Sequence, residues 1–323
     1  MAEDPTARTD WTGDRREELH ARRREQQRRR NRRRLSAALA LVAIAVAILA
    51  VVLGSGGGGG KGSVHEASAT KARPAAAEGE SNLVRNATPQ PGWKPSIGPI
   101  PILEYHVLGA PIPNAPYPEL FVRRADFSRQ MDWLDEHGYQ AVTLEEVEKA
   151  WYRRGTLPAK PVVLSFDDGY RPQFTFALPE LRKHGWPGVL NLKAEGSDLY
   201  PSNIEAMIDA GWELAAHTIH HLDLTTLDAV QLKEEVAGSR AILRREYGVP
   251  VDDFCYPAGR FDETAIAAVK AAGYVGATTE IPGYATRERP YELARFEILG
   301  SSGVSGMAED LRSGAGATAS VGP

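Results

Sequence analysis

Short apolar runs alternate with segments of helical periodicity between about residues 97 and 300 of this 323-residue chain. Runs such as IPILEY, PVVLSF and WELAAH have the length of buried strands, and several lead into a helix-period segment that ends at a glycine. In RADFSRQMDWLDEHG, for example, Phe127, Met131 and Leu134 share one helical face before Gly138. This alternation predicts one α/β domain with a largely parallel sheet.

The N-terminus has a different pattern. Nine arginines and one acid lie between Arg22 and Arg34, and the nineteen residues 35–53, LSAALALVAIAVAILAVVL, carry no charge. A helix of that length, at about 1.5 Å per residue, crosses the roughly 30 Å hydrocarbon core of a bilayer. We therefore predict a basic cytoplasmic segment over 1–34, a transmembrane helix over 35–53 and a single-pass protein whose domain is extracytoplasmic. A cleaved signal peptide is the alternative, but the following GSGGGGGKGS offers no convincing cleavage site.

Composition predicts the remaining boundaries. Residues 54–96 are rich in Gly, Ala and Pro without apolar periodicity, which predicts a flexible linker. The similar composition of residues 301–323 predicts a disordered tail. Residues 97–300 remain, enough for one domain with a sizeable core.

Charge and cysteine content exclude some classes of protein. The first 34 residues hold 12 arginines against 7 acids, a net charge of +5, which leaves 26 basic and 35 acidic residues, a net of −9, for the rest. So acidic an outer part is a poor partner for phosphate backbones, and we expect no nucleic-acid binding. The single cysteine, Cys255, excludes an intrachain disulfide.

Two short motifs carry candidate chemistry. SFDDG ends an expected strand with Asp167 and Asp168, and HTIHHLD places His217 and His221 four residues apart just after another strand. Strand carboxyl ends share one edge of a parallel sheet, where active sites are built. Two histidines and one carboxylate are the three protein ligands typical of catalytic zinc, which keeps a further position open. His220, between the two histidines, is expected to point away from this site. The alternative is a simple turn beside surface histidines.

The motifs resemble those of the polysaccharide deacetylases with a NodB-homology domain, carbohydrate esterase family four. SFDDG is similar to their T-F-D-D-G motif, HTIHHLDL to H-[ST]-x-x-H, and FCYPAGRFD to the third motif. The resemblance covers about residues 99–299 and implies a single distorted (β/α) barrel. Many relatives carry an arginine where Cys255 stands; this chain resembles the F-A-Y-P-x-G branch, which includes deacetylases of poly-N-acetylglucosamine.

The resemblance also implies roles for individual residues. Asp167 would be the general base, and the backbone N–H of Tyr256 would stabilise the oxyanion. Asp168, His217 and His221 would bind a divalent metal, usually Zn²⁺. Metal-activated water would then remove acetyl groups from an N-acetylated cell-surface or extracellular glycan, of the poly-N-acetylglucosamine type or the peptidoglycan of a cell wall.

One part of the family pattern is missing. The family often supplies a general-acid histidine from an L-x-H motif near the end, but here Arg295 stands in that position and no histidine follows His221. His106, at the end of the first expected strand, is a candidate acid, and an equal alternative is a structural histidine. Arg295 is a candidate charge stabiliser but a poor proton donor, and Asp167 could shuttle the proton both ways. An O-acetyl esterase and a non-catalytic glycan-binding module therefore stay open as alternative functions.

Overall fold

A nine-stranded sheet forms the centre of the structure, a computed structural model that describes residues 82–318. Its order is β10-β1-β5-β6-β7-β8-β9, with β11 also paired to β1 and β4 to β5. Every pairing in this sheet is parallel except that of β1 with β10. The strands are β1 Ile100–Tyr105, β4 Gln140–Val142, β5 Pro161–Asp167, β6 Val189–Leu192, β7 Glu213–Ala216, β8 Asp253–Cys255, β9 Gly276–Thr278, β10 Tyr284–Ala285 and β11 Phe296–Glu297.

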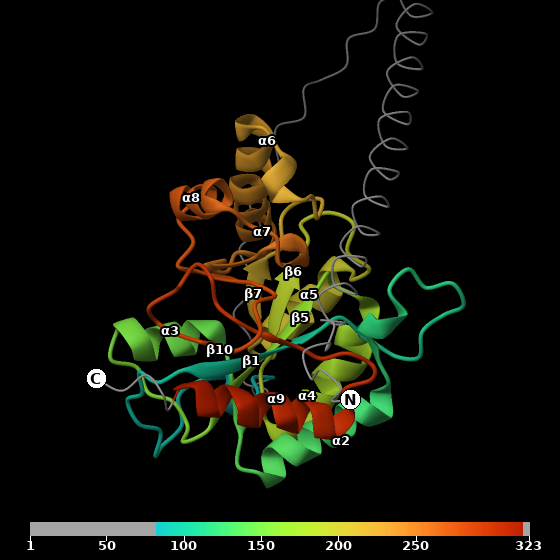
Figure 1. The fold of residues 1–323 in the computed structure, drawn as a ribbon, viewed down its shortest axis with the longest axis vertical. Helices are drawn as coiled ribbons and strands as arrows, with labels where there is room; N and C mark the ends of the chain where they lie inside the picture. The colour runs from blue at the N-terminus through green and yellow to red at the C-terminus, as the bar shows by residue number, and fades with distance from the viewer. Residues whose placement is uncertain (1–81, 319–323) are drawn as a thin grey trace, which may run out of the picture. The chain divides into compact units, whose positions relative to one another are not determined.

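Helices alternate with these strands along the chain and surround the sheet (Figure 1). A separate two-stranded pair joins β2 Val107–Leu108 to β3 Phe121–Val122. The predicted α/β class is therefore confirmed. The helices are α2 Arg124–Glu136, α3 Leu144–Tyr152, α4 Leu178–His184, α5 Pro201–Asp209, α6 Ala229–Lys233, α7 Ser239–Tyr247, α8 Glu263–Ala271 and α9 Gly303–Thr318.

Local sequence signals begin and end these helices. The Thr143 hydroxyl accepts the Glu146 N–H, and the Glu146 carboxylate accepts the Thr143 N–H, which is a capping box at the start of α3. Helix α4 ends at Gly185, whose φ of 74° is the left-handed conformation that glycine adopts without strain. The predicted apolar face of α2, with Phe127, Met131 and Leu134, is fully buried.

One short segment connects the two sides of the sheet. Leu293 forms a parallel bridge with Thr278 of β9, and its carbonyl accepts the Thr279 N–H at 2.9 Å. Three residues later the chain pairs with β1 as β11. The same segment thus joins β9 to β1, and the sheet curves toward the barrel form that the sequence implied.

The domain begins earlier than predicted. Val84 is buried, and its N–H donates to the Ala210 carbonyl at 3.0 Å. Asn86 is fully buried, and its side chain donates to the Ala141 carbonyl at 3.1 Å. Assigning all of 54–96 to a linker was therefore wrong for this part, because two buried side chains are too few to produce an apolar period.

The predicted disordered tail is also wrong for residues 303–318, which form α9. This helix packs against α2 (Figure 1). Its side chains Met307 and Leu311, one helical turn apart, are buried. The glycines and serines around them hid this apolar pair at the level of composition.

The predicted basic segment, membrane span and the first part of the linker lie outside the described residues. Among residues 82–318, no helix combines the length and apolar character that crossing a bilayer requires.

Three carboxyl groups gather at the edge where the strands begin. Glu213 and Asp253 start β7 and β8, and Glu148 reaches them from α3. A side-chain carbon added at Gly276 would lie 2.7 Å from an oxygen of both Glu148 and Asp253, so these two converge. Burial raises the pKa of Glu148 to about 8 and the pKa values of Glu213 and Asp253 well above their usual range. The three carboxyl groups are therefore protonated at a higher pH than exposed carboxyl groups would be.

Replacing Glu148 with Gln should weaken the dependence of stability on pH. The fold keeps the Glu148 proton up to about pH 8, whereas the unfolded chain releases it near pH 4.5. Wild-type stability therefore falls as the pH rises between these values, and the loss is complete above about pH 8. From pH 5 to pH 9, we expect wild type to lose about 4 kcal/mol more than Glu148→Gln, measured by urea unfolding. Glu145→Gln, exposed on the same helix, should behave like wild type, and an unchanged pH dependence in Glu148→Gln would contradict the interpretation.

Candidate metal and catalytic site

Asp168, His217 and His221 converge at the carboxyl edge of the sheet. From Oδ1 of Asp168, Nε2 of His217 is 3.9 Å away and Nε2 of His221 is 3.6 Å away. Ligand atoms bound tetrahedrally to zinc at 2.0–2.2 Å lie about 3.4 Å from one another. The three atoms are therefore spaced as one divalent ion requires, and the residues fit the metal that the sequence implied.

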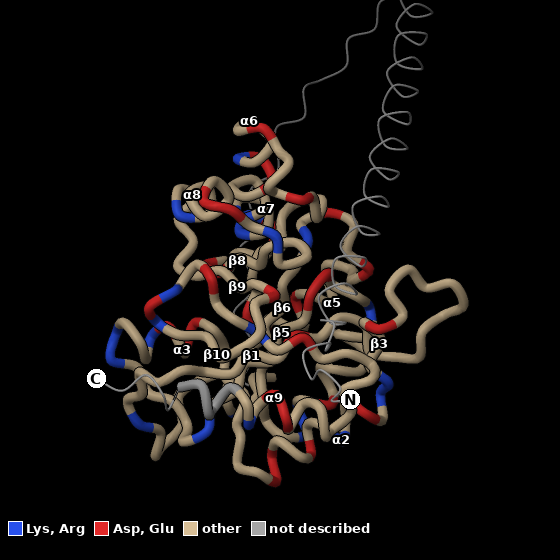
Figure 2. Tube along the Cα trace, in the orientation of Figure 1, with Lys and Arg blue, Asp and Glu red and all other residues tan. Residues whose placement is uncertain are grey.

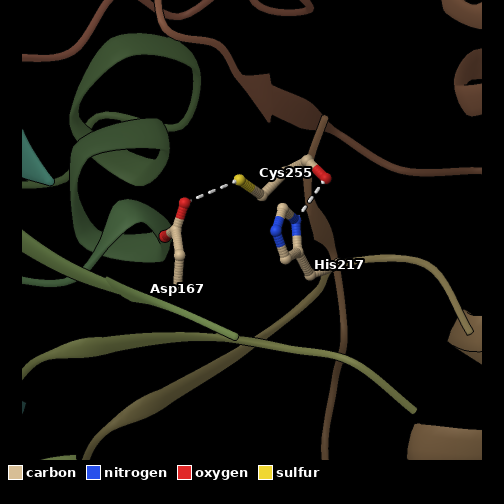
Figure 3. A group of neighbouring side chains, drawn as sticks. All are labelled: Asp167, His217 and Cys255. Carbon is tan, nitrogen blue, oxygen red and sulfur yellow. Dashed lines mark hydrogen bonds between the residues drawn. The ribbon is translucent and has the colours of Figure 1, made fainter. Parts of the chain in front are cut away.

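The backbone of Cys255 sets the tautomer of His217. Nδ1 of His217 lies 2.8 Å from the Cys255 carbonyl, which can only accept, so Nδ1 carries the hydrogen and Nε2 keeps its lone pair (Figure 3). Burial lowers the pKa of His217, which favours the neutral imidazole that binds metals. The ring is thus prepared as a ligand by its surroundings.

Two loops carry unusual backbone conformations at the ligands. Asp168 has φ = 75° and His221 has φ = 58°, left-handed values that cost non-glycine residues about 1–3 kcal/mol each. The His221 N–H donates to the Thr218 hydroxyl at 2.8 Å, so the two histidines are related by a tight loop rather than a helical turn. Gly169 follows at φ = 74°, and a side chain there would lie 2.6 Å from Leu192 Cδ1. Glycine at this position therefore avoids both the strain of a positive φ and a clash with Leu192.

Asp167, the neighbour of Asp168, is held by four hydrogen bonds. Its Oδ1 accepts from Asn191 Nδ2 at 2.7 Å and from Arg295 Nη1 at 2.9 Å. Its Oδ2 accepts from Arg295 Nη2 at 3.0 Å and from the Cys255 thiol at 3.4 Å (Figure 3). Burial alone would raise the pKa of Asp167, but the Arg295 guanidinium overrides it and holds that pKa below its usual range.

Arg295 is almost fully buried and shared between two acids. Its Nη2 lies 3.2 Å from Glu104 Oε2, and its Nε donates to the Thr279 carbonyl at 2.8 Å. Burial raises the pKa of Glu104 well above its usual range in spite of Arg295. The cluster therefore keeps Asp167 ionised and Glu104 protonated. The guanidinium binds groups inside the protein, which makes Arg295 a positioning residue for Asp167 instead of the predicted charge stabiliser.

Cys255 is fully buried, and burial raises the pKa of its thiol well above the usual value. The thiol therefore stays protonated and donates to Asp167, while the backbone carbonyl of the same residue holds His217. Cys255 is therefore a buried residue that positions Asp167 and His217.

The Tyr256 N–H does not face the site. It donates to the Thr278 carbonyl at 3.1 Å and continues the ladder between β8 and β9. The predicted role of this N–H as the oxyanion donor is therefore wrong in this structure, because a backbone N–H has one hydrogen and a strand partner already holds it.

His106 lies beside this cluster, and His220 lies outside it. Nε2 of His106 is 3.7 Å from Glu104 Oε1, and its Nδ1 is buried without a hydrogen-bond partner among residues 82–318. His220 instead pairs with Glu235 at 2.6 Å and Glu195 at 3.2 Å, so it points away as predicted.

Sequence reasoning missed Lys193, which follows β6. Its Nζ lies 3.3 Å from Asp168 Oδ1, the atom that both histidines face. Burial would raise the pKa of Asp168, but His221 first and Lys193 next hold it below its usual range. A strand end at the same edge was the available signal, since Lys193 closes the run VLNLK.

The chain matches the family profile described as polysaccharide deacetylase over residues 154–277. It is 32% identical over 215 residues to YxkH of Bacillus subtilis (strain 168), provisionally named a polysaccharide deacetylase, covering 65% of this chain and 74% of that one. A shorter match is to the poly-β-1,6-N-acetyl-D-glucosamine N-deacetylase of Escherichia coli (strain K12), which is 41% identical over 21% of this chain and 10% of that protein. Another is to the peptidoglycan-N-acetylmuramic acid deacetylase PdaA of B. subtilis (strain 168), which is 31% identical over 42% of this chain and 52% of that protein.

Among solved structures, the Streptococcus pyogenes deacetylase PplD in complex with acetate superimposes with a TM-score of 0.62 at 24% identity, covering 67% of this chain and 99% of that one. This likeness supports the fold. Together with the site geometry, the sequence matches define a hydrolase. The chain belongs to the polysaccharide deacetylase family.

Replacing Arg295 with Met should destabilise the fold strongly. The substitution leaves the Asp167 carboxylate buried without its cation, and breaking a buried pair in this way costs about 3–5 kcal/mol. Chemical denaturation of purified protein measures the loss. Arg289→Met, at an exposed position, should change stability by less than about 0.5 kcal/mol. A loss below about 1 kcal/mol in Arg295→Met would show that the pair does not hold the sheet edge together.

Proposed function

We propose that this chain is a metal-dependent deacetylase that removes acetyl groups from an N-acetylated cell-surface or extracellular polysaccharide, of the poly-N-acetylglucosamine or peptidoglycan type. The observation that carries the proposal is the convergence of Asp168, His217 and His221 beside an ionised Asp167. The names of the E. coli and B. subtilis relatives support the N-acetylated substrate class.

Asp168, His217 and His221 would hold the metal, most readily Zn²⁺ given two imidazoles and one carboxylate. A divalent ion bound there supplies a lowered pKa for water and polarises the acetyl carbonyl. Asp167 accepts the proton of the attacking water, because Arg295 keeps its carboxylate ionised and in place. His106 is the proposed proton donor to the leaving amine, because its buried Nδ1 has no hydrogen-bond partner in the described part of the chain.

Lys193 supplies positive charge for the oxyanion. The Tyr256 N–H is bonded to Thr278, so the backbone donor implied by the family pattern is missing here. The Lys193 ammonium stands 3.3 Å from a ligand oxygen of Asp168, close to where the acetyl carbonyl would bind. A fixed cation near a developing negative charge is worth more in such a secluded site than in water.

The proposed location follows from the sequence. Residues 35–53 would anchor the enzyme in the membrane, and the domain would meet its glycan outside the cytoplasm.

Acetate release by the full chain with zinc tests the function. We expect release from poly-N-acetylglucosamine, peptidoglycan or chitin oligomers. Acetylxylan, whose acetyl groups are esters, tests the O-acetyl esterase alternative. Release from acetylxylan alone would favour an esterase, and no release from any of the four would contradict the proposed activity.

Replacing Asp167 with Asn should lower acetate release by about 10²–10⁴-fold while zinc content stays near wild type, because the base is lost and the metal ligands remain. His217→Ala and His221→Ala should lose both activity and zinc. His220→Ala is the matched histidine control and should retain its zinc. Full activity in Asp167→Asn would overturn the assignment of the base.

Replacing Lys193 with Met should separate catalysis from metal binding. We expect kcat to fall by about 10²-fold, as for the loss of one oxyanion donor elsewhere, while zinc binding stays equal or tightens because a like charge has been removed. Lys193→Arg keeps the charge and should recover part of the activity. Calorimetry gives the zinc affinity, and a Lys193→Met protein that loses zinc and activity together would indicate a structural role instead.

A further inference from the structure

A second cluster of metal-binding side chains lies between α2 and α4, near the amino end of β6 and apart from the strand ends that carry Asp167 and Asp168. Asp132 comes from α2, and Glu180 and His184 come from α4. Each offers one ligand atom, and these three atoms lie within 4.8 Å of one another. Residues four apart on a helix share one face, so Glu180 and His184 both look toward α2. Figure 2 shows acidic residues along α2.

His184 is the centre of this cluster. Its side chain is nine-tenths buried, and its ring is stacked on Trp186 with centroids 4.7 Å apart. Nε2 lies 3.5 Å from Asp132 Oδ1 and has no hydrogen-bond partner in the described part of the chain. Nδ1 lies 3.6 Å from Asp135 Oδ2. A buried imidazole nitrogen is therefore aimed at a carboxylate without a hydrogen-bond partner among residues 82–318.

The two ring nitrogens of His184 face different carboxylates, so one can bind a metal while the other can be held by a hydrogen bond. Metal-binding histidines almost always give their other ring nitrogen to a carboxylate, a carbonyl or water, which orients the ring and raises its basicity. Asp135 stands where that second carboxylate is needed. The 3.5 Å between His184 Nε2 and Asp132 Oδ1 matches the roughly 3.4 Å between ligand atoms on tetrahedral zinc.

We propose that His184 Nε2, Asp132 and Glu180 bind a second divalent cation of the zinc class, with Asp135 orienting the imidazole through Nδ1. The proposal is independent of the reaction at Asp167. It adds a metal site near the amino end of β6, whereas the catalytic residues lie at the carboxyl ends of the strands.

The local charge favours a cation. Asp132, Asp135 and Glu180 bring three carboxylates, and the cation paired within the cluster is Lys183, whose Nζ lies 2.7 Å from Glu180 Oε2. The Lys183 side chain is 66% exposed, so it can turn into solvent when an ion takes its place. The Asp132 and Asp135 carboxylates are more than half exposed, which leaves an entry path and freedom to close on the ion.

An ion at this site would stabilise the packing of two helices. An ion there would join α2 to α4, whose apolar faces already pack together. It would also fix the end of α4, where the Arg85 guanidinium donates to the His184 carbonyl at 2.8 Å and the Asn86 N–H donates to the Gly185 carbonyl at 2.8 Å. Zinc would thus strengthen the docking of the segment around Arg85 and Asn86 against the end of α4.

Zinc stoichiometry of the full chain tests the proposal. After dialysis against a zinc buffer, elemental analysis should find two zinc ions per wild-type chain, one in His184→Gln, one in His217→Ala and none in the double variant. Asp132→Asn, at an exposed position that the fold does not need, should weaken the second site without unfolding the protein. Asp135→Asn should weaken zinc binding at this site by about 10–100-fold.

The controls separate this site from the catalytic one. Glu136→Gln removes a negative charge from the same helix outside the cluster and should leave two zinc ions bound. His184→Gln should keep acetate release, and at about a hundredfold excess over the dissociation constant it should lack about 5 °C of the zinc-dependent rise in Tm that wild type shows. An unchanged zinc content in both His184→Gln and Asp132→Asn would overturn the proposal, whereas zinc that is lost in these variants but kept in His217→Ala would support it even if the catalytic site bound none.

Discussion

The buried pair between Arg295 and Asp167 is the interaction on which the rest of the structure depends. A charge removed from water is tolerated only when it is paired and hydrogen-bonded, and this guanidinium meets that condition by bonding to groups from three parts of the sheet. It reaches Asp167 at the end of β5, Glu104 on β1 and the carbonyl of Thr279 just after β9. The segment that carries Arg295 therefore closes the sheet and orients the base in the same set of bonds.

Parallel pairing then brings distant parts of the chain to one edge. Because β5, β7 and β8 run in the same direction, Asp167, His217 and Cys255 arrive together although 88 residues separate the first from the last. Left-handed turns at Asp168 and His221 tilt their side chains toward a common point. The protein thus accepts local backbone strain at the ligands, and the packed sheet beneath them, in which His217 is almost fully buried, supports it.

The sequence predicted well which side chains would converge where a motif names its own residues, and poorly where a role depends on what lies across the fold. Asp168, His217 and His221 could be chosen from spacing and strand ends. Lys193 also follows a strand that ends at this edge, but a single lysine at the end of VLNLK belongs to no motif that would single it out. The prediction of a disordered tail was wrong for the same kind of reason. Met307 and Leu311 stabilise a helix only because α9 packs against α2, and that contact is not visible in the local sequence.

The amino-acid sequence by itself determined the α/β class, the resemblance to the family and the choice of candidate ligands, because periodicity and short motifs are local properties. Only the tertiary structure decided which hydrogen bonds were already taken. The N–H of Tyr256 pairs with β9, the guanidinium of Arg295 is used within the protein, and His184 faces two carboxylates from another helix. Each outcome depends on a partner distant in sequence, and a backbone N–H such as that of Tyr256, once bonded to a neighbouring strand, has no hydrogen left for a substrate.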